Sequence, residues 1–410
     1  MAYASSDKQG SSSSSHAQEY DLKEQFTEDT RYDSKGSVRN APAPIEPLGK
    51  AIRNNYRLVA WCLAALTGLL LYGYDFVIVG NITSLRAFQR DYGHVFEGHL
   101  IIPSSWFALW KAASPLGTMA GAVIGGSFSD RFGRRASMAA GCIICAIGVG
   151  GCVGSAYTGT LAHRRGVFLG AKLVQGLGIG QTASAVQTYA SEIITPRLRG
   201  PIMSMVPLLT LIGQVIGAAV IAAQSGVATK YAYVTPMLSM LAFTIPPFLA
   251  AIFMPESPVW SVDKSKTPAA ERALIRLRGP NADTSDLLAT IRASVMTEHR
   301  SRTTYMDCFK AAERRQTLLV MIAYTSPQFW GLTLLSNASY FLQVMGMGER
   351  ASLLVVVVGI LLGIVGNIGS VWTISSVGRR KLVLTGLSVT TALWLGVGIA
   401  NCFANGTTLW

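Results

Sequence analysis

Apolar windows long enough to cross a bilayer constrain this chain more than any other feature of its sequence. About nine of them have the length needed to span roughly 30 Å of hydrocarbon. Because lipid leaves no partner for an open sheet edge, each window is predicted to be helical. With 50% hydrophobic and only 14% charged residues, the sequence predicts an all-α membrane protein. The windows cover residues 58–80, 106–127, 136–157, 167–189, 202–223, 234–254, 318–345, 352–374 and 382–403.

The charge distribution predicts how the chain lies in the bilayer. A formal net charge of +13 is compatible with nucleic-acid binding, but Lys and Arg concentrate in alternate loops instead. The richest loops lie around residues 131–135, 197–199, 264–315 and 379–381. The positive-inside rule therefore places the N-terminus in the cytoplasm and indicates a lipid bilayer, not a nucleic acid, as the partner.

Composition divides the chain into four parts. Residues 1–50 are rich in Ser, Gly and charge, which predicts a disordered cytoplasmic tail. Residues 51–254 hold six windows and predict an N-terminal six-helix bundle. Residues 255–315 form a polar cytoplasmic loop, in which 269–278 and 285–297 have the spacing of short helices. Residues 316–410 hold three more windows and predict a partial C-terminal bundle.

The decapeptide GSFSDRFGRR, residues 126–135, is the most specific short motif. It places Asp130 close before Arg134 and Arg135, with Arg131 between them and glycines at Gly126 and Gly133. Glycine permits a turn and close backbone approach, and a carboxylate can accept from a helix N-terminus or an arginine. We interpret the segment as a latch. Positive-inside charge alone would explain the arginines, but not the aspartate and the glycines.

A related segment recurs six windows later. Residues 374–381 read ISSVGRRK, so that Gly378, Arg379 and Arg380 repeat the end of the first motif, while Ser375 and Ser376 stand in place of its Asp and Arg. Two parallel halves, each with its own polar turn, are typical of secondary transporters that rock about a central site.

These motifs resemble those of the sugar porters of the major facilitator superfamily, and especially of fungal maltose and α-glucoside permeases. The resemblance extends from about residue 57 to the end of the chain. It implies twelve spans, so the chain is expected to be truncated after the ninth, with a complete N-terminal bundle and an incomplete C-terminal one. The matching segments, besides the two turns, are Gly73-Tyr74-Asp75, Tyr189-Ala190-Ser191-Glu192 with Arg199-Gly200, Gly213-Gln214, Pro255-Glu256-Ser257-Pro258 with Trp260, Gln328 with Gly331, and Tyr340-Phe341.

Asp75 lies inside the first window, where a carboxylate costs about 2.5 to 3.5 kcal/mol. Lys172 in the fourth window is its expected partner, at a position where the family often has a basic residue. A buried acid that loses its cation when helices move can take up a proton, which is the physical basis of proton symport. The alternative is that water, Asn81 or Arg86 satisfies Asp75 at the outer membrane face.

Amides in the apolar windows are the candidates for binding a sugar. They donate and accept hydrogen bonds at once, as hydroxyl groups require. Each could instead only bond a neighbouring helix. The resemblance assigns sugar contact to Gln214 and Gln328, and it places Thr333 where hexose porters carry asparagine. The predicted substrate-binding residues are Gln187, Gln214, Gln328, Thr333 and Asn337.

A cluster of charges is expected at the cytoplasmic ends of the helices. The resemblance implies that its ion pairs hold the outward-open state and break as the carrier opens inward. The predicted gating residues are Asp130, Arg131, Gly133, Arg134, Arg135, Glu192, Arg199, Glu256, Gly378, Arg379 and Arg380.

Enzyme motifs are not found in the sequence: it has no nucleophile elbow, no P-loop and no second cysteine pair to extend Cys142 and Cys145 into a metal site. We therefore expect no cofactor and no metal. The predicted function is proton-coupled transport of an α-glucoside such as maltose, or of a hexose, by alternating access in the plasma membrane. The alternative is a truncated relative that does not transport, or a nutrient sensor.

Overall fold

The computed structural model describes residues 48–96, 99–279, 284–300, 305–310, 313–329, 331, 337–344, 346–377 and 379–403. The chain divides into two units, Met1–Asn54 and Asn55–Trp410. In the first unit the structure describes helix α2, Leu48–Asn54. Most of the predicted tail lies outside the described residues.

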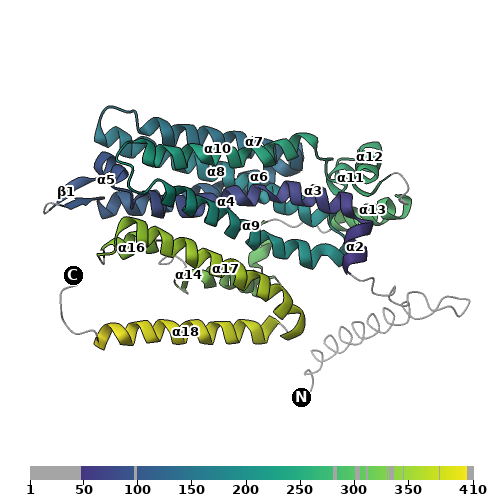
Figure 1. Ribbon diagram of the computed structural model, residues 1–410. Helices are drawn as coiled ribbons and strands as arrows, with labels where there is room; N and C mark the ends of the chain where they lie inside the picture. The colour runs from purple at the N-terminus through teal and green to yellow at the C-terminus, as the bar shows by residue number, and fades with distance from the viewer. Residues whose placement is uncertain are drawn as a thin grey trace, which may run out of the picture. The chain divides into compact units, whose positions relative to one another are not determined.

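The second unit is almost entirely helical (Figure 1). Its elements, in chain order, are α3 (Tyr56–Leu66), α4 (Gly68–Ile82), α5 (Arg86–Tyr92), β1 (His94–Phe96), β2 (His99–Ile101), α6 (Ser104–Phe132), α7 (Arg134–Ser155), α8 (Leu161–Ile193), α9 (Pro196–Ala223), α10 (Tyr231–Phe253), α11 (Pro258–Asp263), α12 (Thr267–Arg278), α13 (Ser285–Arg300), the 3-10 helix η1 (Tyr305–Phe309), α14 (Arg314–Phe329), α16 (Ala338–Val344), α17 (Glu349–Val377) and α18 (Arg379–Phe403).

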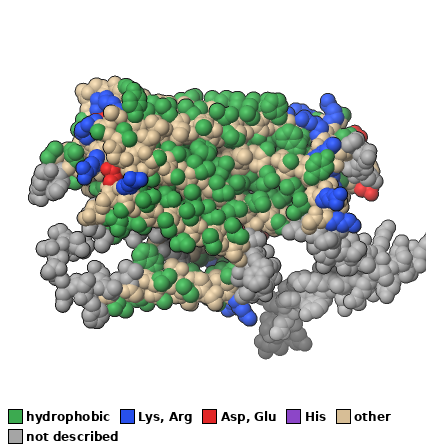
Figure 2. All heavy atoms as spheres, viewed as in Figure 1, with side chains coloured by type: hydrophobic (Ala, Val, Ile, Leu, Met, Phe, Trp, Pro, Cys, Tyr) green, Lys and Arg blue, Asp and Glu red, His purple; other side chains and the backbone are tan. Residues whose placement is uncertain are grey.

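Five stretches of the described residues are long and apolar enough to cross a membrane by length and composition. The remaining predicted windows coincide with α6, with α8, with α14 and α16, and with α18. Figure 2 shows hydrophobic side chains over the middle of the helices and Lys and Arg gathered toward their ends. This arrangement suits lipid around the middle and water at both ends. The five stretches are Tyr56–Ile82, Arg134–Ser155, Leu198–Ala223, Tyr231–Phe253 and Glu349–Ser370.

Glycines bring α6, α7 and α8 into direct backbone contact. A Cβ atom at Gly180 would collide with the carbonyl oxygen of Thr118 on α6, and one at Gly178 would collide with the backbone nitrogen of Cys145 on α7. Gly176, Gly178 and Gly180 of α8 therefore serve helix packing, as small residues do between membrane helices. Glycines bring α4 and α9 into close backbone contact in the same way.

Aromatic side chains fill the end of the bundle next to the hairpin of β1 and β2. Phe88 stacks on Tyr92 with ring centroids 4.3 Å apart, and both rings pack against Trp110, Phe168 and Tyr233. We call these five residues the aromatic cluster. The two strands pair antiparallel, with Val95 opposite Leu100. This hairpin is the one departure from the all-α prediction among the described residues.

The predicted seventh window is divided between two helices. Helix α14 ends at Phe329, Gly331 takes a left-handed φ of +84°, and α16 begins only at Ala338. The window is therefore not one continuous helix. On α16, the Ser339 hydroxyl donates to Asn81 of α4, and Tyr340 stacks on Phe107 of α6 at 5.4 Å.

The polar loop contains both of the helices that its spacing predicted. Helix α12 covers Thr267–Arg278 and α13 covers Ser285–Arg300. On α12, Ala270, Ala273, Leu274 and Leu277 form the buried face. This apolar stripe at helical spacing explains why the segment folds as a helix on the surface of the bundle.

Candidate functional site

A buried ion pair lies in the interior of the helices. Asp75 projects from α4 and Lys172 from α8, and the Nζ atom of Lys172 lies 2.8 Å from Oδ1 of Asp75. Their side chains are only 7% and 3% exposed, so both charges are almost fully removed from bulk solvent. In such a site each ion depends on its partner and on further hydrogen bonds.

Two further side chains complete the shell of the carboxylate. Nε2 of Gln175, on the same helix as Lys172, donates to Oδ1 of Asp75 at 3.0 Å. The hydroxyl of Ser114, on α6, donates to Oδ2. The carboxylate therefore accepts from an ammonium, an amide and a hydroxyl. These four residues form the interior site.

Ser114 and Gln175 were not predicted as site residues. Gln175 follows Lys172 by three positions, so both lie on one helix face, and that spacing was the available signal. Ser114 offered no comparable signal, because its position opposite Asp75 depends on the close contact between α6 and Gly176 of α8.

The alternative expectation, that Asn81 or Arg86 satisfies Asp75, is wrong. The Asn81 amide donates to the carbonyl of Val77 at 3.1 Å, and its oxygen accepts from Ser339. Arg86 is exposed at the start of α5. Asp75 is instead satisfied from α6 and α8, inside the bundle.

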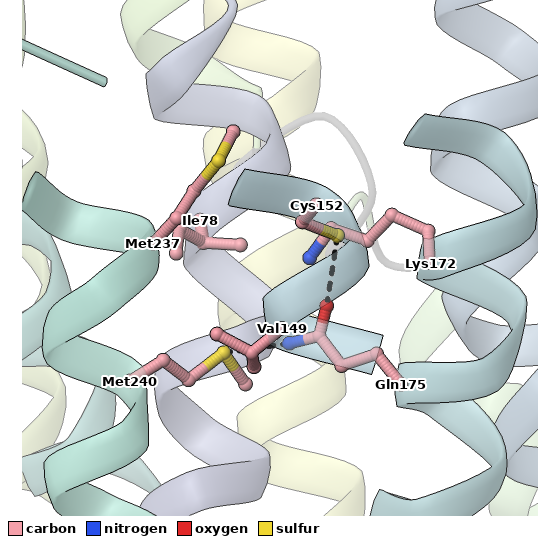
Figure 3. Close-up of a pocket in the computed structure, with 7 residues that line it drawn as sticks. All are labelled: Ile78, Val149, Cys152, Lys172, Gln175, Met237 and Met240. Atoms are coloured by element: carbon pink, nitrogen blue, oxygen red, sulfur yellow. Dashed lines mark hydrogen bonds between the residues drawn. The ribbon is translucent and has the colours of Figure 1, made fainter. Parts of the chain in front are cut away.

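A small cavity adjoins the interior site (Figure 3). It is lined by Lys172 and Gln175 together with Ile78, Val149, Cys152, Met237 and Met240. The Oε1 atom of Gln175 accepts from Sγ of Cys152 at 3.7 Å. The cavity measures about 10 Å³, close to the least that one water molecule needs. It is therefore far too small to hold a sugar.

A second charge cluster lies at the junction of α6 and α7, at the opposite end from the aromatic cluster. Two nitrogen atoms of Arg134 bind the carboxylate of Glu192 on α8: Nε lies 3.1 Å from Oε2 and Nη2 lies 2.6 Å from Oε1. Its Nη1 lies 3.2 Å from Oδ1 of Asp130 and donates to the carbonyl of Ser129 at 3.0 Å. This fork-like pairing is the strongest geometry open to arginine. We call these residues, with Glu256, the Arg134 cluster.

Glu256 caps the start of α7. Its Oε1 accepts from the backbone nitrogens of Arg134 at 3.0 Å, Arg135 at 3.4 Å and Ser257 at 3.1 Å. A carboxylate at a helix N-terminus satisfies free donors and suits the helix dipole. Glu256 thus ties the segment after α10 to the turn between α6 and α7.

The turn of the decapeptide is confined to Gly133. Its φ is +99°, a conformation that favours glycine, and a Cβ atom there would lie 2.5 Å from Oε2 of Glu256 and displace this carboxylate. Gly126 is different: it lies within α6, and a Cβ atom there would meet nothing within 4 Å. The expectation that Gly126 belongs to the turn is wrong, because α6 continues to Phe132.

The side chains of the other predicted gating residues that the structure describes point elsewhere. Arg135 binds the carbonyl of Ala251 at 3.0 Å. Arg131 is exposed, with its guanidinium 5.6 Å from the ring centre of Phe132, and Arg199 is exposed as well. Neither joins the Arg134 cluster among the described residues. In the second motif Gly378 lies outside the described residues, as does the side chain of Arg379, while Arg380 is exposed at the start of α18.

The candidate sugar-binding amides lie on different elements. Gln187 is exposed on α8, and Gln214 is partly buried on α9. Asn337 is partly buried just before α16. The side chain of Gln328 and the whole of Thr333 lie outside the described residues. Gln181, by contrast, donates to the carbonyl of Ser137 at 3.2 Å and serves helix packing.

The helical architecture is that of a multi-pass transporter of the major facilitator superfamily. The chain belongs to the family described as Sugar (and other) transporter, whose model matches residues 61–409. It is 26% identical over 377 residues to the arabinose-proton symporter of Bacillus subtilis, covering 89% of this chain and 76% of that protein. It is also 26% identical over 378 residues to the alpha-glucosides permease MPH3 of Saccharomyces cerevisiae, covering 87% of this chain. The chain spans 60% of the length of that permease.

Solved structures share the fold. The proton:xylose symporter XylE, bound to 6-bromo-6-deoxy-D-glucose, matches with a TM-score of 0.66 at 21% identity, over 80% of this chain and 71% of that one. The partially occluded inward-open form of XylE from E. coli matches with a TM-score of 0.62 at 20% identity, over 79% and 75%. The relatives are transporters, not enzymes.

Proposed function

We propose that this protein is a secondary active sugar transporter that couples sugar movement to protons by alternating access. The observation that carries the proposal is the ion pair of Asp75 and Lys172, both of whose side chains are buried in the interior of the helices. Two of the relatives described above are proton symporters by name, one for arabinose and one for xylose.

In this proposal Asp75 accepts the proton and Lys172 is the cation that the proton displaces. Two unit charges 4 Å apart attract by about 4 kcal/mol at an effective dielectric constant of 20. A proton on Asp75 removes most of that attraction between α4 and α8. Their packing can then shift, and this links proton binding to the change from one open state to the other.

The Arg134 cluster serves as the gate in this scheme. It joins α6, α7 and α8 to the segment that follows α10, all at one end of the bundle. We infer that this end is cytoplasmic, because the loops at this end are rich in Lys and Arg. The same rule supports a cytoplasmic N-terminus. We also propose a plasma-membrane location, which the likeness to sugar permeases supports.

The proposed substrate is an α-glucoside such as maltose, or a hexose. The likeness to the yeast permease supports the first, and amides on several spans supply the hydrogen-bonding groups that sugar hydroxyls need. We retain Gln187, Gln214, Gln328, Thr333 and Asn337 as the proposed contacts.

Replacing the proton acceptor tests the proposal. In proteoliposomes with an imposed proton gradient, Asp75→Asn should abolish accumulation of labelled maltose or glucose against its gradient. Exchange of labelled for unlabelled sugar should survive, because the amides are untouched. Asp286→Asn, the same change at an exposed carboxylate on α13, should retain both activities. Full uphill accumulation by Asp75→Asn would show that Asp75 is not the coupling group.

A further inference from the structure

The membrane windows contain one more cation than anion. Across all of the predicted windows the sequence places only three charged residues: Asp75 in the first, Lys111 in the second and Lys172 in the fourth. Lys172 is paired with Asp75 in the interior site. The charge of Lys111 therefore has no counterpart within the windows, although a charged side chain within a membrane-spanning segment is costly.

Asp75 does not compensate Lys111 directly. Its Oδ1 already accepts from Lys172 and Gln175, and its Oδ2 accepts from Ser114. Among the described residues, no hydrogen bond or ion pair holds the ammonium group of Lys111. Its charge still lies close enough to interact electrostatically with Asp75 and Lys172. In the described part of the chain, Lys111 is thus a cation beside the interior site that no side chain neutralises by a direct contact.

The neighbours of Lys111 on α6 show where it lies. Ser114, three positions later, reaches Asp75, and Phe107, four positions earlier, stacks on Tyr340 of α16. Residues at these spacings share one helix face. Lys111 is partly buried on this face, between the interior site and the seventh window.

We propose that Lys111 binds the carboxylate of an acidic sugar, such as a uronate or an aldonate, so that sugar acids are substrates of this transporter. The inference rests on the proposed function and refines its substrate class. A carboxylate brings the single negative charge that the windows lack, and it forms a charge-assisted hydrogen bond with an ammonium group. A neutral sugar leaves the cation uncompensated, and a phosphate ester brings nearly two charges at neutral pH.

Uptake of acidic and neutral sugars by the same protein tests the inference. The protein is reconstituted in proteoliposomes, and uptake of labelled glucuronate and gluconate is compared with that of labelled glucose and maltose. The wild type should take up at least one of the acids in a saturable manner. In Lys111→Gln the ratio of acidic to neutral uptake should fall at least tenfold, whereas Lys111→Arg should retain most of the wild-type ratio. Lys50→Gln, at an exposed lysine of α2, should leave the ratio unchanged.

The possible negative results separate a failure of the role of Lys111 from a failure of the proposed function. Uptake of glucose or maltose without uptake of either acid would overturn the role of Lys111 and leave the proposed transport of sugars intact. A Lys111→Gln variant with the wild-type ratio would also overturn it, because the selectivity would then come from elsewhere. Absence of saturable uptake for all four compounds would overturn the proposed function itself.

Discussion

At the scale of single residues, Gln175 connects the interior site to three other helices. Its Nε2 donates to Asp75 on α4 and lies 2.6 Å from the sulfur of Met240 on α10. Its Oε1 accepts from Cys152 on α7. One side chain on α8 therefore contacts three other helices. Holding the Asp75 carboxylate toward Lys172 is a positioning role, distinct from taking up the proton.

The change Gln175→Leu tests this role. It removes a hydrogen bond to a charged group and should destabilise the protein by about 1 to 3 kcal/mol. It should also lower uphill accumulation more than exchange, because the carboxylate is held less firmly. Gln181→Leu is the matched control: a buried amide of the same helix that binds a backbone carbonyl. Both variants should unfold at lower temperature, and only Gln175→Leu should lower the ratio of accumulation to exchange. Equal ratios in the two variants would assign Gln175 to packing alone.

At the scale of elements, the junction of α6 and α7 depends on a single residue conformation. Gly133 separates two long helices, and Glu256 occupies the space where a side chain would point. The cap on α7 and the turn are therefore one structure. Loss of either loosens the Arg134 cluster, because Arg134 is the first residue of α7.

The change Gly133→Ala should destabilise the protein by at least about 1 kcal/mol, since a left-handed φ is strained for alanine and the new methyl group displaces Glu256. Gly126→Ala provides the contrast within the same motif. It lies in a helix with open space around it, and alanine there should be neutral or stabilising by up to about 1 kcal/mol. Thermal unfolding in detergent measures both. A Gly133→Ala variant as stable as Gly126→Ala would show that the turn tolerates a side chain.

At the scale of the whole molecule, side-chain clusters tie several of the first six predicted spans together at each end of the bundle. The aromatic cluster joins α5, α6, α8 and α10 at one end, and the Arg134 cluster joins α6, α7 and α8 at the other. The later helices meet this unit mainly through α16 on α4 and α17 on α9. We therefore expect the sugar site to form between a rigid first half and residues of the seventh window.

A substitution on α14 tests that expectation. Gln328→Ala should raise the apparent KM for the transported sugar about two- to tenfold, which corresponds to one lost hydrogen bond of roughly 0.5 to 1.5 kcal/mol. Gln316→Ala, the same change at an exposed position of the same helix, should leave KM unchanged. Initial uptake rates over a range of sugar concentrations give both values. An unchanged KM for several sugars in Gln328→Ala would leave this glutamine without a role in binding.

The sequence predicted the structure correctly where a type of residue can be accommodated in a membrane in only a few ways. Long apolar windows must be helical in lipid, and a carboxylate such as Asp75 needs a cation in reach, which the structure provides in Lys172. It failed where the answer depends on the packing of distant segments. Ser114 reaches Asp75 only because Gly176 lets α6 approach α8, and the interruption after Phe329 depends on the conformation of Gly331. The roles of the predicted site residues stay predictions.

The pairing of Asp75 with Lys172 also sets the order in which the protein can be built. The two residues are 97 positions apart, and synthesis proceeds from the N-terminus at about 5 to 20 residues per second. The ribosome therefore needs about 5 to 20 s to reach the lysine codon after it has passed the aspartate codon. During that interval α4 is already available for insertion, while the lysine that pairs with Asp75 has not been made. The ion pair can therefore form only after α8 has been synthesised, and Asp75 must be accommodated without Lys172 until then.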